Sequence, residues 1–275
     1  MVNFVTVKIG EKYTPTYVNR VFEMCKEHVS YPFTFHCYTD NPVGIDPQIE
    51  VIPFIDHGFS TIVHNKLFLF SEQFEKKLCS ASPRIFLDID VVIRDTIDDL
   101  IAFAYQTKEP LGVINASWKQ YTRSELLTNV NLHSINSSCM VWKPFDNTHI
   151  WKHFSENYQR MSKVYEKGMD AYLVHEHNVF GKLPETLFCS FLNGAPKKYF
   201  RLVKNLDQYS KISQSFPIVL FNGPTIEEDI TTFIESNCTW SLFDMTDAFS
   251  DNKELRKQAA ERAERILYER TIKMM

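Results

Sequence analysis

The hydrophobic and polar positions in the first third of the chain switch between a period of two and a helical period. Alternating, β-branched stretches predict strands, and apolar residues three and four apart predict helices. In chain order, the expected elements are strand Asn3–Ile9, helix Tyr13–Val29, strand Phe33–Tyr38, strand Glu50–Ile55, helix Lys66–Lys77 and strand Arg84–Ile93. This β-α-β-β-α-β order predicts an α/β fold with a mostly parallel central sheet and helices on both faces.

The pattern becomes looser in the rest of the chain. Strands are expected at Leu111–Asn115, Ser138–Trp142 and Pro217–Phe221, and a helix at Thr148–Lys167. Asn252–Met275 is charged and carries one apolar stripe, which predicts an amphipathic C-terminal helix that packs on the body or on a partner. A homodimer through this helix is therefore one expectation.

These elements predict one continuous domain over residues 1–250. Residues 1–115 are expected to form a nucleotide-binding half, and residues 116–250 a half that binds the rest of the substrates. Residues 251–275 form the expected C-terminal helix.

Composition narrows the class of protein. Hydrophobic residues make up 44% and charged residues 23% of the 275 residues, which is typical of a folded soluble chain. The net charge of −4 argues against nucleic acid as the main partner. We find no signal peptide and no apolar run long enough for a transmembrane helix. The six cysteines form no Cys-x-x-Cys motif, so we expect reduced core thiols and a cytoplasmic protein.

The sharpest chemical signal is a pair of acids, Asp88 and Asp90, within an otherwise apolar run. Side chains two apart on a strand point to the same side, so the two carboxylates are expected to project together. They would repel each other, and burial would add to the cost of their charge. A divalent cation removes both costs, and an all-oxygen site suits Mg²⁺ or Mn²⁺. The alternative is that one aspartate caps a turn and the other is solvated.

Several short motifs around this pair occur in a familiar order. They are Thr6-Val7-Lys8 with Tyr13, Tyr38-Thr39-Asp40, Asn65-Lys66-Leu67, Phe86-Leu87-Asp88-Ile89-Asp90, Asn136-Ser137-Ser138-Cys139-Met140-Val141-Trp142, Gly168-Met169-Asp170 and Phe221-Asn222-Gly223-Pro224. Together they resemble the GT-A-type glycosyltransferases, which use nucleotide sugars and hold a metal on a D-x-D motif. Within that class the chain is similar to glycogenin-like and to capsular or lipopolysaccharide sugar transferases.

The resemblance implies a GT-A-like, Rossmann-type fold and an enzyme that moves a sugar from a nucleoside-diphosphate sugar, most often a UDP-sugar. The acceptor would be a hydroxyl of a saccharide, a lipid-linked sugar or a protein. Mn²⁺ or Mg²⁺ would bind Asp88 and Asp90. The implied donor-binding residues are Thr6, Val7, Lys8, Tyr13, Asp40, Lys66, Asp88, Ile89, Asp90, Ser137, Asn222 and Gly223, and the residues implied near the reacting centre are Asn136 and Asp170.

Two positions depart from the family pattern. Asn222 stands where the family usually has a metal-binding His, and no Lys-Pro follows it. Asp170 lacks the Gln that usually comes next.

Simpler interpretations remain open for most of these residues. Lys66 could be a surface lysine at a helix start, and Asp40 could serve an Asx turn. Tyr13 could be a core aromatic, Asn136 and Ser137 could be polar strand-edge residues, and Asp170 could be a solvated loop acid. His175 and His177 are expected on the surface or on a substrate loop.

Two other functions also remain open. A haloacid-dehalogenase-type phosphatase has a similar D-x-D string, in which Asp88 would be the nucleophile and Asp90 the acid. That motif normally follows the first strand, whereas about eighty residues precede it here. The chain could also be a sugar-nucleotide binder that has lost activity, which Asn222 in place of His would suit.

Overall fold

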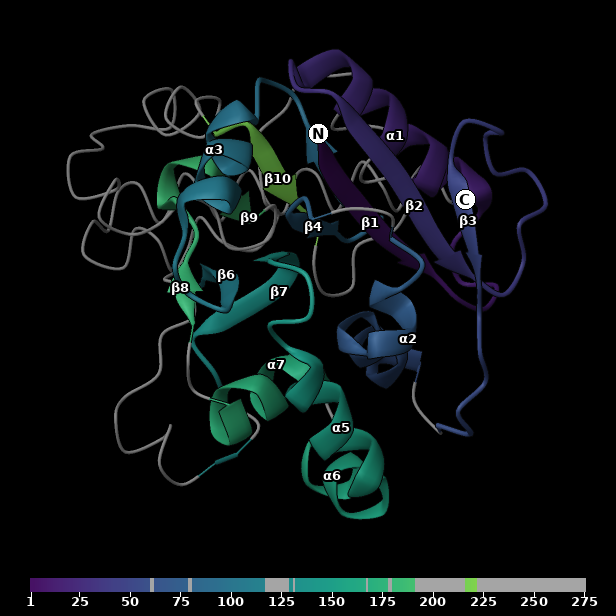
Figure 1. Ribbon diagram of the computed structural model, residues 1–275, viewed down its shortest axis with the longest axis vertical. Helices are drawn as coiled ribbons and strands as arrows, with labels where there is room; N and C mark the ends of the chain where they lie inside the picture. The colour runs from purple at the N-terminus through teal and green to yellow at the C-terminus, as the bar shows by residue number, and fades with distance from the viewer. Residues whose placement is uncertain are drawn as a thin grey trace, which may run out of the picture.

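The computed structural model describes residues 1–59, 62–78, 81–116, 129–130, 132–166, 168–177, 180–190 and 216–221. Its centre is a seven-stranded sheet in the order β3-β2-β1-β4-β7-β6-β8 (Figure 1). The strands are β1 Val2–Lys8, β2 Phe33–Thr39, β3 Glu50–Pro53, β4 Arg84–Leu87, β6 Leu111–Asn115, β7 Ile135–Trp142 and β8 Gly181–Lys182. β7 runs antiparallel to both of its neighbours, and the other pairs are parallel. The expected mostly parallel α/β sheet is therefore confirmed.

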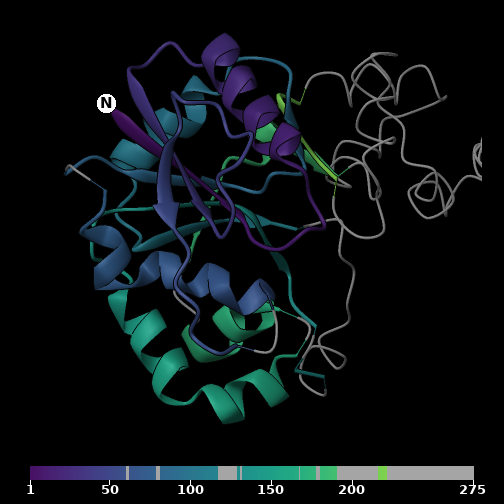
Figure 2. The same ribbon diagram turned by 90° about the vertical axis from the view of Figure 1, so that its right-hand side faces the viewer.

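Helices cover both faces of this sheet (Figure 2). One face packs against α1 and α3 and against a small second sheet in the order β5-β10-β9. The bounds on this side are α1 Pro15–His28, α3 Asp98–Gln106, β5 Val91–Ile93, η3 Glu185–Leu187, β9 Phe188–Ser190 and β10 Ile218–Leu220.

The other face carries an aromatic-rich core beneath a second helical layer. This layer is built from the 3₁₀ helix η1 Ile62–Phe70, α2 Glu72–Glu75, α5 Thr148–Glu156, α6 Tyr158–Val164, α7 Met169–Tyr172 and the π-helical turn η2 Leu173–His177. The two helical layers place the sheet in the middle of the molecule, as both views show.

A buried ion pair anchors β4 to the second helical layer. Arg84 begins the strand, and its Nη2 lies 2.9 Å from Oε2 of Glu75, with both side chains only 1% exposed. Trp142 on β7 donates its indole N–H to the other carboxylate oxygen over 2.7 Å. A buried charge needs such partners, because an unpaired one is costly. The network fixes the strand from which the site extends.

The expected strand Arg84–Ile93 is wrong as one element. β4 ends at Leu87, a turn takes up Asp88–Asp90, and the chain then enters β5 in the second sheet. Two hydrogen bonds hold this turn: the Asp88 amide donates to the Ser138 carbonyl over 2.8 Å, and the Phe221 amide donates to the Asp90 carbonyl over 3.1 Å. The two acids therefore lie between two sheets, beyond the carboxyl end of β4.

Two expected helices are interrupted. In place of Lys66–Lys77, η1 starts four residues earlier and α2 follows Ser71, whose hydroxyl caps α2 by accepting from the Phe74 amide over 3.0 Å. The helix expected at Thr148–Lys167 ends at Glu156, and α6 begins after Asn157.

Other expectations from the sequence fall partly outside the described residues. The C-terminal helix, the dimer through it and the boundary at residue 250 lie there, as do Cys79 and Cys238. Cys25, Cys37, Cys139 and Cys189 are buried free thiols. Among the helices that the structure describes, none is long and apolar enough to cross a membrane.

Candidate active site at the end of the fourth strand

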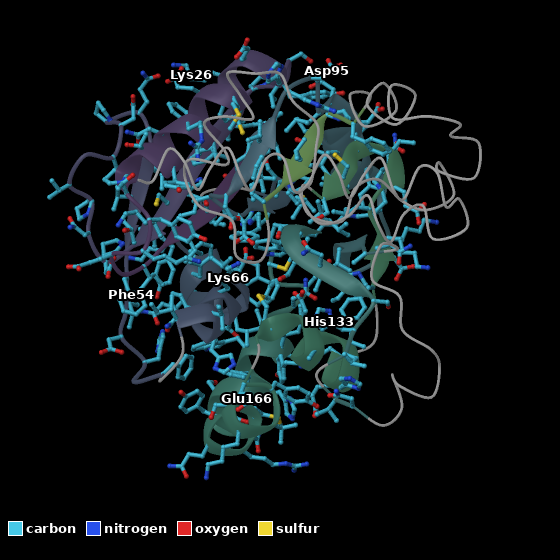
Figure 3. The ribbon with its side chains drawn as sticks, turned by 180° about the vertical axis from the view of Figure 1, so that it is seen from behind. Lys26, Phe54, Lys66, Asp95, His133 and Glu166 are labelled. Atoms are coloured by element: carbon cyan, nitrogen blue, oxygen red, sulfur yellow. The ribbon has the colours of Figure 1, made fainter. Side chains whose placement is uncertain are left out.

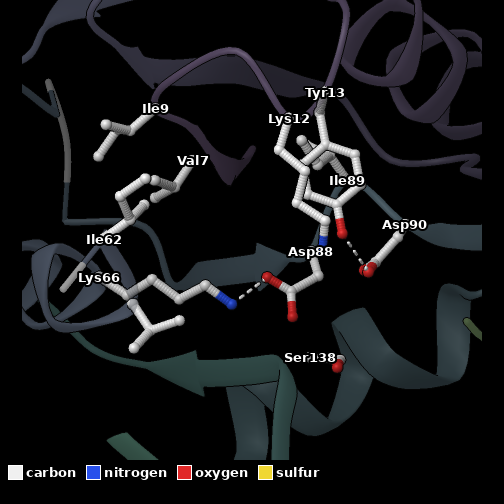
Figure 4. Close-up of a pocket in the computed structure, with 11 residues that line it drawn as sticks. Val7, Ile9, Lys12, Tyr13, Ile62, Lys66, Asp88, Ile89, Asp90 and Ser138 are labelled. Carbon is white, nitrogen blue, oxygen red and sulfur yellow. Dashed lines mark hydrogen bonds and ion pairs between the residues drawn. The ribbon is translucent and has the colours of Figure 1, made fainter. Parts of the chain in front are cut away.

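A cavity of about 350 Å³ opens beyond the carboxyl ends of β1 and β4. In open α/β sheets this is where ligands bind. Its walls come from β1 and the loop after it, from η1, from the turn after β4 and from β7 (Figure 4). The lining residues are Val7, Ile9, Lys12, Tyr13, Ile62, Val63, Lys66, Asp88, Ile89, Asp90 and Ser138.

Asp88 and Asp90 both line this cavity, although they sit in a turn. Each has a different partner. Lys66 forms an ion pair with Oδ1 of Asp88, and the Tyr13 hydroxyl donates to Oδ2 of Asp90 over 3.1 Å (Figure 4). The Lys66 and Asp88 side chains are 21% and 18% exposed, so this pair is largely shielded from solvent. Lys66 lines the cavity and its side chain is only 21% exposed, which contradicts the alternative of a surface lysine.

Burial and neighbouring charges shift the pKa values of three groups in the site. Burial, reinforced by the charge of Asp88, raises the pKa of Asp90 to about 6, even though Lys66 and Tyr13 lower it in part. Burial alone would lower the pKa of Lys66, but its carboxylate neighbours Asp88, Asp90 and Asp170 raise it overall. Burial, and then Asp90, raises the pKa of the Tyr13 hydroxyl. The charged form of Asp90 is therefore disfavoured in this cavity, mainly by burial and further by Asp88, and Lys66 offsets only part of this effect.

This donor set fits a hard divalent cation. Asp88 and Asp90 both line the cavity with carboxylate oxygens, and the pKa of Asp90 is raised by burial and then by the charge of Asp88, both of which a bound cation would offset. Within the described ranges, no three His, Cys, Asp or Glu side chains are placed to hold one metal ion. Asp88 and Asp90 could supply two ligands, and Mg²⁺ or Mn²⁺ commonly completes such a shell with water and substrate phosphates.

Asp170 lies in the first turn of α7, after Gly168, whose φ of 129° favours glycine. Its Oδ1 accepts the Ser137 amide over 3.1 Å, and its Oδ2 is 3.7 Å from Nδ1 of His133, which Figure 3 labels. Asp170 also contributes to the raised pKa of Lys66. It therefore acts electrostatically on the same lysine as the D-x-D pair.

The polar residues at the start of β7 hydrogen-bond with one another and with the turn that carries Asp88. Oδ1 of Asn136 accepts the Ser138 amide over 2.8 Å, and Ser138 in turn lines the cavity and holds the Asp88 amide through its carbonyl. Asn136 and Ser137 lie inside β7, because the strand starts earlier than its apolar run suggests.

Six of the implied residues that the structure describes are not part of the lining of this cavity: Thr6, Lys8, Asp40, Asn136, Ser137 and Asp170. Thr6 is fully buried and donates to the Leu87 carbonyl over 2.8 Å, which ties β1 to the end of β4. Asp40 accepts the Gly10 amide over 2.9 Å, and the Lys8 ammonium is 3.4 Å from the Gly10 carbonyl. Asp40 and Lys8 therefore both contact Gly10, in the loop after β1. Val7 and Ile89 do line the cavity, and Asn222 and Gly223 lie outside the described residues.

Several residues that line the cavity were not predicted from the sequence. Lys12 adds a second cation from the loop after β1, with its ammonium 4.6 Å from the Tyr13 ring centre. The sequence feature that could have indicated Lys12 is its place in a short loop that follows a predicted strand and contains Gly10. Ile62 and Val63 form an apolar edge and are 54% and 38% exposed. Nothing in the local pattern separates them from core residues.

No protein-family model matches the chain, and no curated protein matches its sequence. Solved structures do match its fold. The galactosyltransferase LgtC in complex with donor and acceptor sugar analogs is 13% identical, with a TM-score of 0.55 over 86% of this chain and 96% of that chain. An active-site mutant of LgtC is 12% identical, with a TM-score of 0.57 over the same shares.

The glycosyltransferase GlyE of Streptococcus pneumoniae TIGR4 is 10% identical, with a TM-score of 0.53, and the match covers 82% of this chain and 56% of that one. Identities this low speak for the fold alone. The chain has a GT-A-type fold, as the sequence motifs led us to expect.

Proposed function

We propose that the chain is a metal-dependent glycosyltransferase that moves a sugar from a UDP-sugar to an acceptor hydroxyl. One observation carries this proposal. The turn after β4 brings Asp88 and Asp90 to a common cavity with Lys66 and Lys12, in a fold that sugar transferases share. The cavity volume of about 350 Å³ lies in the range of roughly 300–1,000 Å³ for small-molecule sites.

The difficult part of the reaction is the leaving nucleoside diphosphate, which gains negative charge as the glycosidic bond breaks. A divalent ion bound by Asp88 and Asp90 would supply a Lewis acid for that charge. The protein adds fixed positive charge, because Lys66 and Lys12 line the same cavity. With Asp88 holding a cation, Lys66 would be available to bind a phosphate oxygen of the donor. Tyr13 keeps Asp90 oriented through its 3.1 Å hydrogen bond.

Asp170 is the acid that we place on the acceptor side. The Ser137 amide orients its carboxylate, and its charge reaches Lys66. In an inverting enzyme it would take the proton of the acceptor hydroxyl. In a retaining enzyme the departing phosphate itself would take that proton, and Asp170 would only position the sugar. The anomeric configuration of the product, read by NMR, separates the two.

A donor panel tests the proposal. The protein is incubated with Mn²⁺ and a series of nucleotide sugars, and free nucleoside diphosphate is measured. We expect slow hydrolysis of one donor that depends on the metal and falls about 100-fold or more in Asp90→Asn, the size of effect seen when transition-state charge loses its stabilisation. Asp146→Asn, an exposed acid, is the matched control and is expected to keep full activity.

The other outcomes identify the rival functions. Phosphate release from small phosphomonoesters, lost in Asp88→Asn, would favour the phosphatase and contradict the transferase. A donor that raises the melting temperature without turnover would favour a binding protein, since a ligand stabilises the folded state by mass action.

A further inference from the structure

Lys66 already provides a positive charge for one of the two acids at the candidate cation site. The helix η1 brings it to the cavity, where its ammonium pairs with Oδ1 of Asp88 (Figure 4). The ammonium also lies 5.2 Å from the ring centre of Phe86, so the lysine packs against the strand that leads into the turn. Because the Lys66 side chain is only 21% exposed, solvent and salt screen this charge weakly.

A cation that binds Asp88 would lie beside this ammonium. It would either share the carboxylate with Lys66 or displace the lysine from it. Sharing brings two positive charges close together, and displacement separates a shielded ammonium from its carboxylate. In both cases the ion pair between Lys66 and Asp88 lowers the affinity for a cation that binds by itself.

The charged side chains that line the cavity balance one another. The described lining contains two acids, Asp88 and Asp90, and two lysines, Lys66 and Lys12. Asp170 acts on Lys66 from outside this lining. A divalent cation alone would therefore give the lining side chains an excess of positive charge. A diphosphate carries about one negative charge per phosphate, which would remove that excess.

A diphosphate also reverses the effect of the lysines. Lys66 and Lys12 line the same cavity, and a lysine binds a phosphate as a point charge. A cation that binds together with a diphosphate lies near ammonium groups whose charge the phosphates neutralise. The same two lysines thus oppose a cation alone and favour a cation paired with a diphosphate.

We propose that Lys66 makes cation binding at Asp88 and Asp90 conditional on the donor diphosphate, so that the cavity takes up the two as a pair and holds a bare cation only weakly. This inference rests on the proposed function, because it needs the cation site. It gives Lys66 a role beyond contact with a phosphate, which is to couple the two ligands. Since coupling is reciprocal, each ligand raises the affinity for the other by the same factor.

Binding of Mn²⁺ to the full chain at pH 7.5 tests the proposal without a turnover assay. Free Mn²⁺ is followed by its EPR signal with and without saturating UDP, and the same titration without protein corrects for Mn²⁺ that UDP binds in solution. For the parent protein, we expect UDP to raise the affinity for Mn²⁺ at least about tenfold. Lys66→Met is expected to bind Mn²⁺ alone at least about tenfold more tightly than the parent, and UDP should add less in this variant.

The direction of this change separates coupling from a structural role. If Lys66 only held the turn in place, its removal would loosen the two acids and weaken Mn²⁺ binding. Lys66→Gln removes the charge and keeps an N–H donor for Asp88, so it should also tighten the binding of Mn²⁺ alone, and it decides the question should Lys66→Met fail to fold. Lys152→Met is the matched control, because this exposed lysine on α5 is not part of the lining, and it should bind Mn²⁺ as the parent does.

The outcomes distinguish this inference from the proposed function. Lys66 variants that bind Mn²⁺ alone no more tightly than the parent would overturn the inference and leave the proposed transferase standing. A Lys152→Met protein that gains as much affinity as Lys66→Met would also overturn it, because the effect would then come from net charge alone. A parent that binds no Mn²⁺ at about 1 mM, with or without UDP, would contradict the cation site and both proposals with it.

Discussion

Replacing Asp90 by Asn is expected to stabilise the ligand-free protein near pH 8 while it removes the metal-dependent activity. The Asp90 carboxylate is held in an unfavourable place, because burial and the charge of Asp88 raise its pKa to about 6. Asparagine has nearly the same shape and keeps an oxygen for the Tyr13 hydroxyl, which donates over 3.1 Å. The substitution thus removes a buried charge and its repulsion from Asp88, and it keeps the hydrogen bond.

The size and the pH range of the effect follow from the two pKa values of Asp90. The difference between about 6 in the folded protein and the ordinary 3.8 corresponds to about 3 kcal/mol, at about 1.36 kcal/mol per pKa unit. Since the side chain is partly exposed and solvent screens it, we expect about 1–2 kcal/mol.

The direction follows from proton binding. Between pH 4 and 6, approximately, the folded state holds more protons on Asp90 than the unfolded state does. The contribution of Asp90 to stability therefore falls as pH rises through this range and is constant above it.

Urea unfolding of the parent and of Asp90→Asn at pH 4.5, 6 and 8, in the presence of a chelator, measures the difference. We expect the gain from the substitution to grow from roughly a third of its full value at pH 4.5 to its full value at pH 8. Asp146→Asn serves as the exposed control and should stay within about 0.5 kcal/mol of the parent at each pH. An Asp90→Asn protein that is less stable at pH 8, or whose gain is the same at pH 4.5, would refute the reasoning.

Three further substitutions probe the same network and its support. Lys66→Met should raise the pKa of Asp90 above 6, whereas Lys66→Arg should leave it near the parent value. An NMR titration that observes the carboxyl carbon of Asp90 measures both. Tyr13→Phe should also raise that pKa, because the hydroxyl bond favours the charged carboxylate, and the same NMR titration checks it. Arg84→Met should cost about 3–5 kcal/mol in urea unfolding, since it leaves Glu75 buried without its cation, and adding Glu75→Gln should recover part of the loss.

The strands of the central sheet were the part of the fold that the sequence predicted best. β1, β2 and β6 begin and end within a residue or so of their expected bounds, and β3 begins as expected but ends earlier. Buried parallel strands need near-continuous apolar runs between turn residues, and this signal is local. The antiparallel direction of β7 was not predicted, because strand direction depends on which neighbours the strand pairs with and not on its own pattern.

The break at the end of β4 could not have been predicted from its own residues. An apolar run with two acids has the same pattern whether the strand continues or turns. The bonds that fix the turn come from Ser138 and Phe221, which are about 50 and 130 residues further along the chain. The paired acids still reach one cavity, although the turn, rather than the pleat of a strand, brings them there.

In the candidate site, too, the residues in local sequence motifs were predicted, whereas those brought to the cavity only by folding were not. Tyr13, Lys66 and the two acids were named from short motifs, and they meet at the cavity. Ile62 and Lys12 were missed, because membership of a cavity wall is a property of the folded chain. Motif residues such as Thr6 and Asp40 instead hold the loops around the cavity through backbone hydrogen bonds.

The position of the D-x-D turn also explains why an unfavourable charge arrangement can persist there. The turn joins β4 of the large sheet to β5 of the small one, and the buried side chains of both strands fix its two ends. Packing on either side therefore holds the two acids together against their repulsion, and Lys66 offsets only part of the cost. A bound cation would recover the rest as binding free energy. The raised pKa of Asp90 and the proposed cation affinity thus have one physical origin, which is a buried carboxylate that lies beside a second acid.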